Sequence, residues 1–500
     1  MRKKSRGPSV VDPEIAEKNW SSSEIWDREH RILTLALVLC VSFSAFEALA
    51  VIAVLPAIVT EIGGLGLYGW VLSVFMLANL VGLVTAGQSA DRKGPARAFG
   101  LGLFLFSVGL LGAGFAPNMS GLVAARAVQG FGAGAIGAVS YVAIGRSYSE
   151  EARPQMLALI STAWVVPGLI GPALAGSVAE FIGWRWVFFG LAGPTLAFGA
   201  LALRPLSLLQ PVHAESLPDE ARRKDNDAGE GGVLSTGAHR LRSLDPRILS
   251  ILLAVGTGCF LLGLETQAPL QAFFVIAVGA LLGLPSLVGL MPKGTLLGRS
   301  GLPAGLAVIF VLGFSFFGAE AFIPLALSEI HNVPLSLAGL PLSLGTLFWT
   351  FGAWIQAREA FRRSRRALIG MGLGLVALGI SGSAGLLFPS VPYGLSGLAW
   401  AIAALGMGLA YSTCSLVILE LAPKGQEGES SASLQLATNL GIALGVGVGG
   451  GLVATATEDS LAWGIGMVDA LTLSVVLFAL LIVRGIPGRS SSPGEADLSE

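Results

Sequence analysis

The sequence predicts an all-α membrane protein that crosses the bilayer fourteen times. Hydrophobic residues make up 53% of its 500 residues and charged residues only 13%, about half the charged share of typical soluble domains. Mean hydropathy is +0.74, and a soluble globule of this length could not cover its surface with so few charges. The chain also contains fourteen apolar runs near the length of about 20 residues that a bilayer-spanning helix needs.

The predicted spans fall in the order six, two and six. The first six cover 32–58, 68–90, 98–116, 120–145, 155–180 and 187–204, the next two cover 248–266 and 269–291, and the last six cover 303–328, 335–357, 367–388, 392–419, 430–455 and 462–484. We therefore expect six regions: a tail (1–31), a six-helix bundle (32–204), a linker (205–247), two additional helices (248–291), a second six-helix bundle (303–484) and a tail (485–500). The linker is polar and lacks apolar periodicity, which is typical of flexible connections.

The positions of Lys and Arg predict the orientation. With the N-terminus in the cytoplasm, 29 of the 31 Lys and Arg residues fall in tails and loops on the cytoplasmic side. Arg185 lies in an external loop and Arg126 lies within a span. Because cytoplasmic loops are enriched in Lys and Arg, we expect both termini in the cytoplasm.

The two six-helix blocks resemble each other. At an offset of 270, five residues coincide with identical ones: Gly100, Gly102, Leu103, Leu105 and Gly109 with Gly370, Gly372, Leu373, Leu375 and Gly379. The first helix of each block carries a similar string that ends in an acidic residue, Glu47 in one and Glu320 in the other. Both blocks begin on the same side, so the repeat is parallel, as in many transporters.

A charged motif follows span two. It reads Gly87-Gln-Ser-Ala-Asp91-Arg92-Lys93-Gly94-Pro-Ala-Arg97 and resembles the cytoplasmic motif G-x-x-x-D-R-x-G of the major facilitator superfamily. Pro95 and Ala96 replace two usually basic residues, so Arg97 is the remaining cation. We interpret the motif as a conformational latch that pairs across the two halves in one state. Ordinary topology explains Arg92 and Lys93 adequately, but it does not explain Asp91 between Gly87 and Gly94.

Three further motifs resemble the same family. Span four reads Leu122-x-x-x-Arg126-x-x-Gln129-Gly130, and span five reads Gly168-x-x-Gly171-Pro172-x-x-x-Gly176, which is similar to the fifth-helix motif of antiporters. The entry to span six, 184–189 with Pro194 beyond it, resembles the 14-helix drug:proton antiporter branch. The resemblance covers roughly 32–484 and implies the major facilitator fold, with two extra helices beside two six-helix bundles. We also expect the small residues of span five, and those at 441, 445 and 449, to let neighbouring helices approach closely.

Two ionisable residues inside spans are the main candidates for function. A charge such as that of Arg126 costs at least ~2.5–3.5 kcal/mol in an apolar helix unless it faces a cavity or a partner. Glu47 lies about 24 Å along its helix from Arg31, well inside the bilayer. The resemblance implies that Arg126, with Gln129 on the same turn, and Glu47 take part in proton coupling or substrate binding. A structural ion pair or a hydrogen-bonded carboxyl is the alternative.

Weaker candidates accompany them. Glu320 is the equivalent of Glu47 and is a candidate for proton or substrate binding, whereas Glu265 and Asp469 lie nearer the ends of spans and could reach lipid headgroups. Five aromatic residues could line a central cavity or pack in the core: Phe46, Phe75, Trp164, Phe317 and Trp349. Cys40, Cys259 and Cys414 lie in apolar runs, so we expect free thiols and no metal cluster.

These observations predict a secondary transporter of a bacterial-type plasma membrane. We expect it to export hydrophobic or amphipathic small molecules in exchange for protons, as a monomer, without a cofactor or nucleic acid. It is not expected to be an enzyme, since no nucleophile, base or metal constellation is evident. Alternatives are a lipid or metabolite exporter, a symporter, and a transport-inactive receptor or scaffold.

Overall fold

The computed structural model describes residues 24–28, 30–209, 244–359, 362–423, 427–455 and 461–486. Most of the linker and of the two tails lies outside these residues. All regular elements of the described part are helical, and fourteen segments are long and apolar enough to cross a membrane. The predicted fold class and number of spans are confirmed.

The spans have the following bounds. The first six are α2 (Arg31–Ile62), α3 (Tyr68–Lys93), α4 (Pro95–Gly114), α5 (Met119–Ser147), α6 with α7 (Arg153–Thr162 and Val165–Phe181) and α8 (Arg185–Ser207). The additional pair is α11 (Pro246–Glu265) and α12 (Pro269–Leu290). The last six are α13 to α15 (Leu302–Leu312, Gly318–Glu320 and Ile323–Glu329), α16 with α17 (Leu335–Ala338 and Leu340–Glu359), α18 (Arg365–Ser383), α19 (Tyr393–Glu420), α20 (Glu427–Ala454) and α21 (Leu461–Ile482).

The connection predicted at 205–247 is shorter than expected at both ends. Helix α8 continues to Ser207. Helix α11 begins at Pro246, because the Asp245 side chain accepts a hydrogen bond from the Arg247 amide and caps the helix. Proline at the first helical position has no amide hydrogen that needs a partner, so it favours this start.

The ninth span is interrupted near its predicted acidic residue. A π-helical segment, Gly313–Phe317, separates α13 from α14, and Ala321 and Phe322 separate α14 from α15. The backbone of α20 approaches this region closely, since a Cβ at Gly441 would lie 3.0 Å from the Phe314 nitrogen. The glycines of span thirteen therefore serve helix packing, as expected.

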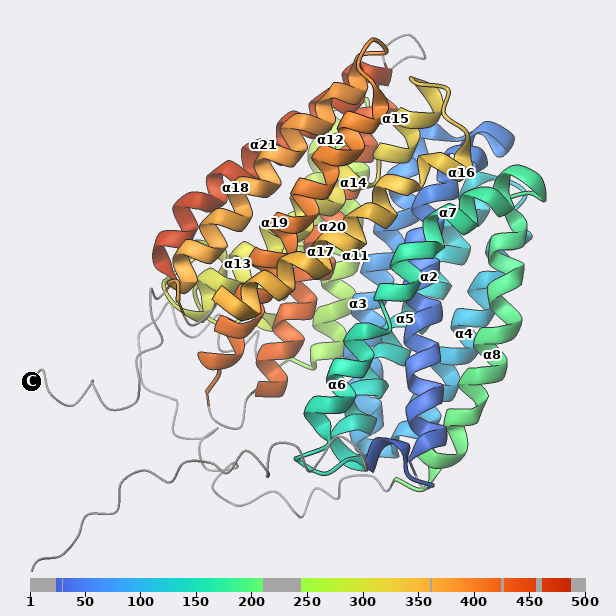
Figure 1. Cartoon of the computed structure of the whole chain (residues 1–500), viewed down its shortest axis with the longest axis vertical. Helices are drawn as coiled ribbons and strands as arrows, with labels where there is room; N and C mark the ends of the chain where they lie inside the picture. The colour runs from blue at the N-terminus through green and yellow to red at the C-terminus, as the bar shows by residue number, and fades with distance from the viewer. Residues whose placement is uncertain are drawn as a thin grey trace, which may run out of the picture.

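The two six-helix halves are built alike. In the first half α5 packs against α3 and α4, and in the second half α19 packs against α17 and α18. These are the corresponding spans of the repeat. In Figure 1 the first half, blue to green, stands beside the second half, yellow to red.

The halves meet mainly near the end of the molecule where α2 ends, which is the predicted external side. Tyr68 on α3 donates a hydrogen bond to the Ala321 carbonyl at 2.9 Å and stacks on Phe322. In Figure 1 the ribbons of the halves converge in the upper part and diverge below. Tyr141 and Gln435 share a hydrogen bond between the halves that lies nearer the opposite side.

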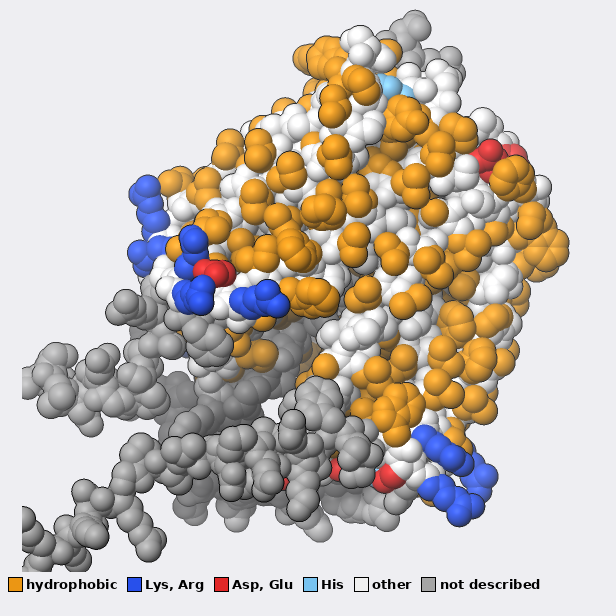
Figure 2. Space-filling view, in the orientation of Figure 1, with side chains coloured by type: hydrophobic (Ala, Val, Ile, Leu, Met, Phe, Trp, Pro, Cys, Tyr) orange, Lys and Arg blue, Asp and Glu red, His pale blue; other side chains and the backbone are white. Residues whose placement is uncertain are grey.

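The outer surface suits a bilayer. Large apolar side chains are exposed on the flanks of the bundles, for example Phe104 on α4, Leu281 on α12 and Phe478 on α21. Figure 2 shows this apolar surface, with Lys and Arg gathered at the left, near mid-height, and at the lower right. Charge is thus restricted to the ends of the spans on the visible face.

Candidate functional site

Glu47 and Arg126 form a buried ion pair between α2 and α5. The Arg126 Nη1 donates to Glu47 Oε1 and, at 2.8 Å, to the amide oxygen of Gln129. Glu47 is fully buried and Arg126 is 1% exposed. The three residues that the sequence assigned to proton coupling in the first half therefore form one cluster.

Helix α3 supplies the remaining contacts of the arginine. Its Nε donates to the Val71 carbonyl at 3.2 Å, and its guanidinium lies over the Phe75 ring at 4.0 Å from the centroid. The sequence offered Phe75 as a cavity or core aromatic, but not as the partner of Arg126. Only the approach of α3 to α5, at Gly130 and Gly134, brings these groups together.

The cluster is incompletely satisfied. Glu47 Oε2 and Gln129 Nε2 are buried and have no hydrogen-bond partner among the described residues. A buried ion pair is costly unless its remaining polar atoms are paired, and protonation of Glu47 would remove one of the two charges. The arrangement can therefore bind and release a proton, with Arg126 competing for the carboxylate.

Glu320 occupies the equivalent place in the second half but has different neighbours. Its Oε1 accepts a hydrogen bond from the Trp400 indole at 3.3 Å, and its Oε2 is buried without a partner in the described part of the chain. Phe316 stacks on Trp400 with ring centroids 4.6 Å apart. The sequence analysis missed Trp400, whose indole N–H inside an apolar span was the available signal.

The two weaker acidic candidates behave differently from each other. Glu265 is the last residue of α11, as expected, but both of its oxygens accept from the Trp70 indole, at 2.9 and 2.8 Å. Asp469 lies about 12 Å into α21, nearer to an end of its span than Glu47 is to either end of α2, as expected.

The charged motif is more helical than a loop. Asp91 and Arg92 belong to the last turn of α3, and only Gly94 separates α3 from α4. Gly94 has φ 86°, a backbone conformation that favours glycine. Asp91 binds Arg146 of α5 at 2.6 Å, so among the described residues its ion pair lies within the first half. Arg97 is exposed at the start of α4.

The fifth-helix motif lies on the boundary between the halves. A Cβ at Gly168 would lie 2.6 Å from the Thr346 hydroxyl of α17, and one at Gly176 would lie 2.8 Å from the Leu335 carbonyl carbon of α16. Gly171 faces Phe46 of α2 in its own half. The expected close approach is present, and two of its three glycines face the second half. A Cβ at Gly87 would meet no described atom within 4 Å outside its own helix.

The other predicted aromatic residues divide into two groups. The ring centroids of Trp349 and Phe317 lie 6.0 Å apart. These two rings form a cluster with Phe316 and Tyr411, close to Glu320. Trp164 is 47% exposed, directly before α7, and makes none of the ring contacts of that cluster.

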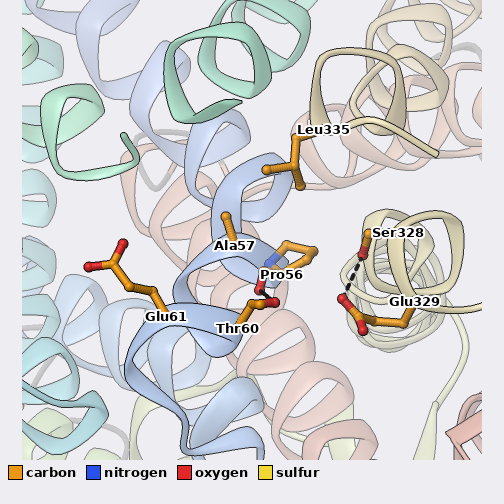
Figure 3. Close-up of a pocket in the computed structure, with 7 residues that line it drawn as sticks. All are labelled: Pro56, Ala57, Thr60, Glu61, Ser328, Glu329 and Leu335. Atoms are coloured by element: carbon orange, nitrogen blue, oxygen red, sulfur yellow. Dashed lines mark hydrogen bonds between the residues drawn. The ribbon is translucent and has the colours of Figure 1, made fainter. Parts of the chain in front are cut away.

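A pocket of about 280 Å³ lies on the predicted external side, between α2 and the ends of α15 and α16. Figure 3 shows Glu61 and Glu329 on opposite sides of Pro56. Pro56 is about 13 Å further along α2 than Glu47, so this pocket is separate from the ion pair. Cys40, Cys259 and Cys414 are free thiols, and no group of three potential metal ligands occurs in the described ranges.

Two parallel six-helix halves with buried ionisable residues at equivalent positions define a membrane transporter. The sequence profile of the Major Facilitator Superfamily matches residues 35–446, and the chain belongs to this family. It is a transport protein of that family.

The chain is similar to named drug transporters. A protein of Mycobacterium tuberculosis named "Probable multidrug-efflux transporter" is 25% identical over 465 residues, which cover 89% of this chain and 92% of the relative. A multidrug transporter protein of Bacillus subtilis is 22% identical over 444 residues, covering 86% of this chain and 77% of the relative.

Solved structures of transporters share the fold. A D-xylose-proton symporter has a TM-score of 0.63 and 13% identity, covering 92% of this chain and 98% of that one. A bacterial homologue of the human lysosomal transporter Spinster, in an inward-facing and unoccupied conformation, has a TM-score of 0.62 and 15% identity, with the same coverage. At these identities the likeness shows the fold alone.

Proposed function

We propose that this protein exports hydrophobic or amphipathic small molecules across a bacterial plasma membrane in exchange for protons. Both termini lie in the cytoplasm, and the two halves alternate in opening to either side. The observation that carries the proposal is the buried Glu47–Arg126 pair, with its unpartnered Glu47 oxygen. The names of the relatives support export of drugs.

The coupling step follows from the electrostatics of the pair. When Glu47 takes up a proton, Arg126 loses its counter-charge and turns to Gln129, the Val71 carbonyl and the Phe75 ring. A buried, uncompensated arginine is unfavourable, which favours a conformation in which water or substrate reaches it. When Glu47 releases its proton, its negative charge returns, the ion pair with Arg126 forms again and the cycle is complete.

A symporter of the same fold is the second candidate, since Glu320 is also buried with a free oxygen and could carry the proton instead. In the exporter proposed here, Glu320 and its aromatic neighbours select the substrate. A lipid or metabolite exporter would transport a different set of substrates, and a protein without transport would move none of them.

The test uses inverted membrane vesicles and a panel of apolar, amphipathic and sugar substrates, with and without an imposed proton gradient. Glu47→Gln, which mimics the protonated carboxyl, should abolish uphill accumulation and spare gradient-free counterflow. Glu320→Gln should keep uphill accumulation and change which substrates are accepted.

The matched control is Glu61→Gln, on the same helix but in a half-exposed pair with Arg185. It should leave accumulation close to that of the unmodified protein. If Glu47→Gln still concentrates substrate while Glu320→Gln cannot, the second half carries the proton. Absence of gradient-dependent transport of every substrate would contradict a proton-coupled exporter.

A further inference from the structure

The two additional helices are not equally connected to the rest of the molecule. Helix α12 packs mainly against α11, whereas α11 also packs against α3 of the first half and α20 of the second. Helix α11 therefore lies along the seam where α3 and α20 meet. We call α11, Pro246–Glu265, the bridging helix.

The seam itself is held by close backbone approach and hydrogen bonds. A Cβ at Gly69 would lie 2.8 Å from the Gly450 Cα, the Ser73 hydroxyl donates to the Ala443 carbonyl at 2.8 Å, and Asn439 donates to Asn79 at 2.9 Å. These contacts join the two halves directly, so those nearest the external side must separate if the halves part there.

The bridging helix binds the two halves by different chemistry. Toward α3, the Glu265 carboxylate accepts the Trp70 indole N–H with both oxygens. Toward α20, the contact is apolar: Leu261, 1% exposed, fills the space left by Gly447, where a Cβ would lie 2.8 Å from its Cδ2. Further along, Gly451 faces the apolar stem of Glu265.

This difference decides which half the bridging helix follows. If it moved with α20, the charge-assisted hydrogen bond between the Trp70 indole N–H and the Glu265 carboxylate would be lost, and such bonds are stronger than those between neutral groups. If it moved with α3, only the packing of Leu261 on Gly447 would be lost, and lipid tails can replace an apolar contact.

We propose that α11 and α12 move with the first half as one body, that Trp70 and Glu265 hold them there, and that the α11–α20 contact is the one that opens. This rests on the proposed alternation of the two halves. It gives the additional helices a role, which is to cover the α3–α20 seam on the predicted external side when the seam is closed.

The first test uses two crosslinks that share one residue. The native cysteines are replaced, Leu261→Cys is combined with either Ser73→Cys on α3 or Gly447→Cys on α20, and both pairs react with the same short bifunctional thiosulfonate. Transport by the same sample after reduction is the reference. The α11–α3 link should preserve transport, and the α11–α20 link should lower it by at least about tenfold, reversibly.

Every other pattern overturns the proposal. If both links are tolerated, the bridging helix does not move relative to either half; if the α11–α3 link alone blocks transport, it follows the second half. If both block it, it moves against both. Failure of the reduced samples and of the unmodified protein to transport any substrate would instead count against the proposed function.

The second test needs no transport. Spin labels replace the exposed residues Leu270 on α12, Phe181 on α7 and Trp463 on α21. The Leu270–Phe181 distance distribution should be narrow and the Leu270–Trp463 distribution broad. Trp70→Phe, which removes only the indole donor, should broaden the first distribution, and Trp186→Phe, an exposed ring, should not. A narrow Leu270–Trp463 distribution beside a broad Leu270–Phe181 distribution would overturn the proposal.

Discussion

Arg126 is tolerated inside an apolar helix because its guanidinium has four partners. A carboxylate, an amide oxygen, a backbone carbonyl and an aromatic face surround it, drawn from α2, α3 and α5. These partners stabilise the positive charge only where the guanidinium lies among them. Removing one member leaves a charge whose desolvation nothing else offsets.

Arg126→Ala should therefore abolish proton-driven transport and also reduce stability. Breaking a buried pair by removing one partner costs about 3–5 kcal/mol, because the other charge stays buried. The double variant Glu47→Gln with Arg126→Gln should recover most of the stability but not the transport. Thermal unfolding in detergent and gradient-driven uptake measure the two effects separately.

Arg185→Ala is the matched control for this experiment. Arg185 pairs with the half-exposed Glu61 and lies over the Trp184 ring at 4.3 Å, so its loss should cost at most about 1 kcal/mol, as for exposed pairs. Proton-coupled rates of the unmodified protein in Arg126→Ala would contradict the assignment.

The corner between α3 and α4 is explained by the residues of its own sequence. Asp91 lies in the last turn of α3, Gly94 turns the chain with φ 86°, and Pro95 begins α4, where its missing N–H has no cost. The departure of Pro95 from the family pattern thus has a structural reason. Asp91 and Arg146 connect this corner to α5.

Asp91→Asn should slow turnover much more than it weakens substrate binding or folding. The Asp91 side chain is 60% exposed, and exposed pairs contribute about 0–1 kcal/mol to stability, so expression should stay normal. Glu359→Gln, which changes a pair with Arg363 at the corresponding corner of the second half, is the control. Equal loss of affinity and turnover would argue against a latch.

Gly176→Ala should disfavour the state that is closed on the predicted external side. The new methyl group would overlap the Leu335 carbonyl of α16, and overpacking of this kind typically costs about 1–3 kcal/mol. External thiol labelling of a single Ala57→Cys reporter, in the pocket between the halves, should rise. Gly190→Ala meets no atom within 4 Å and should leave labelling unchanged.

At the scale of the whole molecule, the structure is closed where α2 ends. The contacts of Tyr68, Gly69 and Gly176 with the second half all lie near that end. If the halves alternate as rigid bodies, opening there must be accompanied by closing at the other end.

Two pairs of spin labels test this relation. One pair replaces Phe181 and Trp463 near the end where α2 ends, and the other replaces Arg204 and Arg362 near the end where α2 begins. Between the unmodified protein and Glu47→Gln, the two distances should change in opposite directions. A change of both distances in the same direction would contradict rigid-body alternation.

Composition and hydropathy along the chain were sufficient to predict a lipid environment, fourteen spans and an internal repeat. Hydropathy over about 20 residues follows from bilayer thickness, and a lone arginine in an apolar run requires a partner. Glu47, Arg126 and Gln129 could therefore be proposed before their geometry was known. The breaks near Glu320 could not, because π-helical turns depend on neighbouring backbones such as that of α20.

The partners of the buried polar groups could not be predicted before the packing of the helices was known. Val71 and Phe75 reach Arg126, Trp400 reaches Glu320, and Trp70 reaches Glu265 from segments that are 51 to 195 residues away. Composition and spacing act along the chain, whereas a hydrogen bond inside a membrane depends on how closely two helices approach and on the rotation of each about its axis. Small residues at the helix contacts determine how closely two helices approach, and which helices meet depends on the packing of all of them.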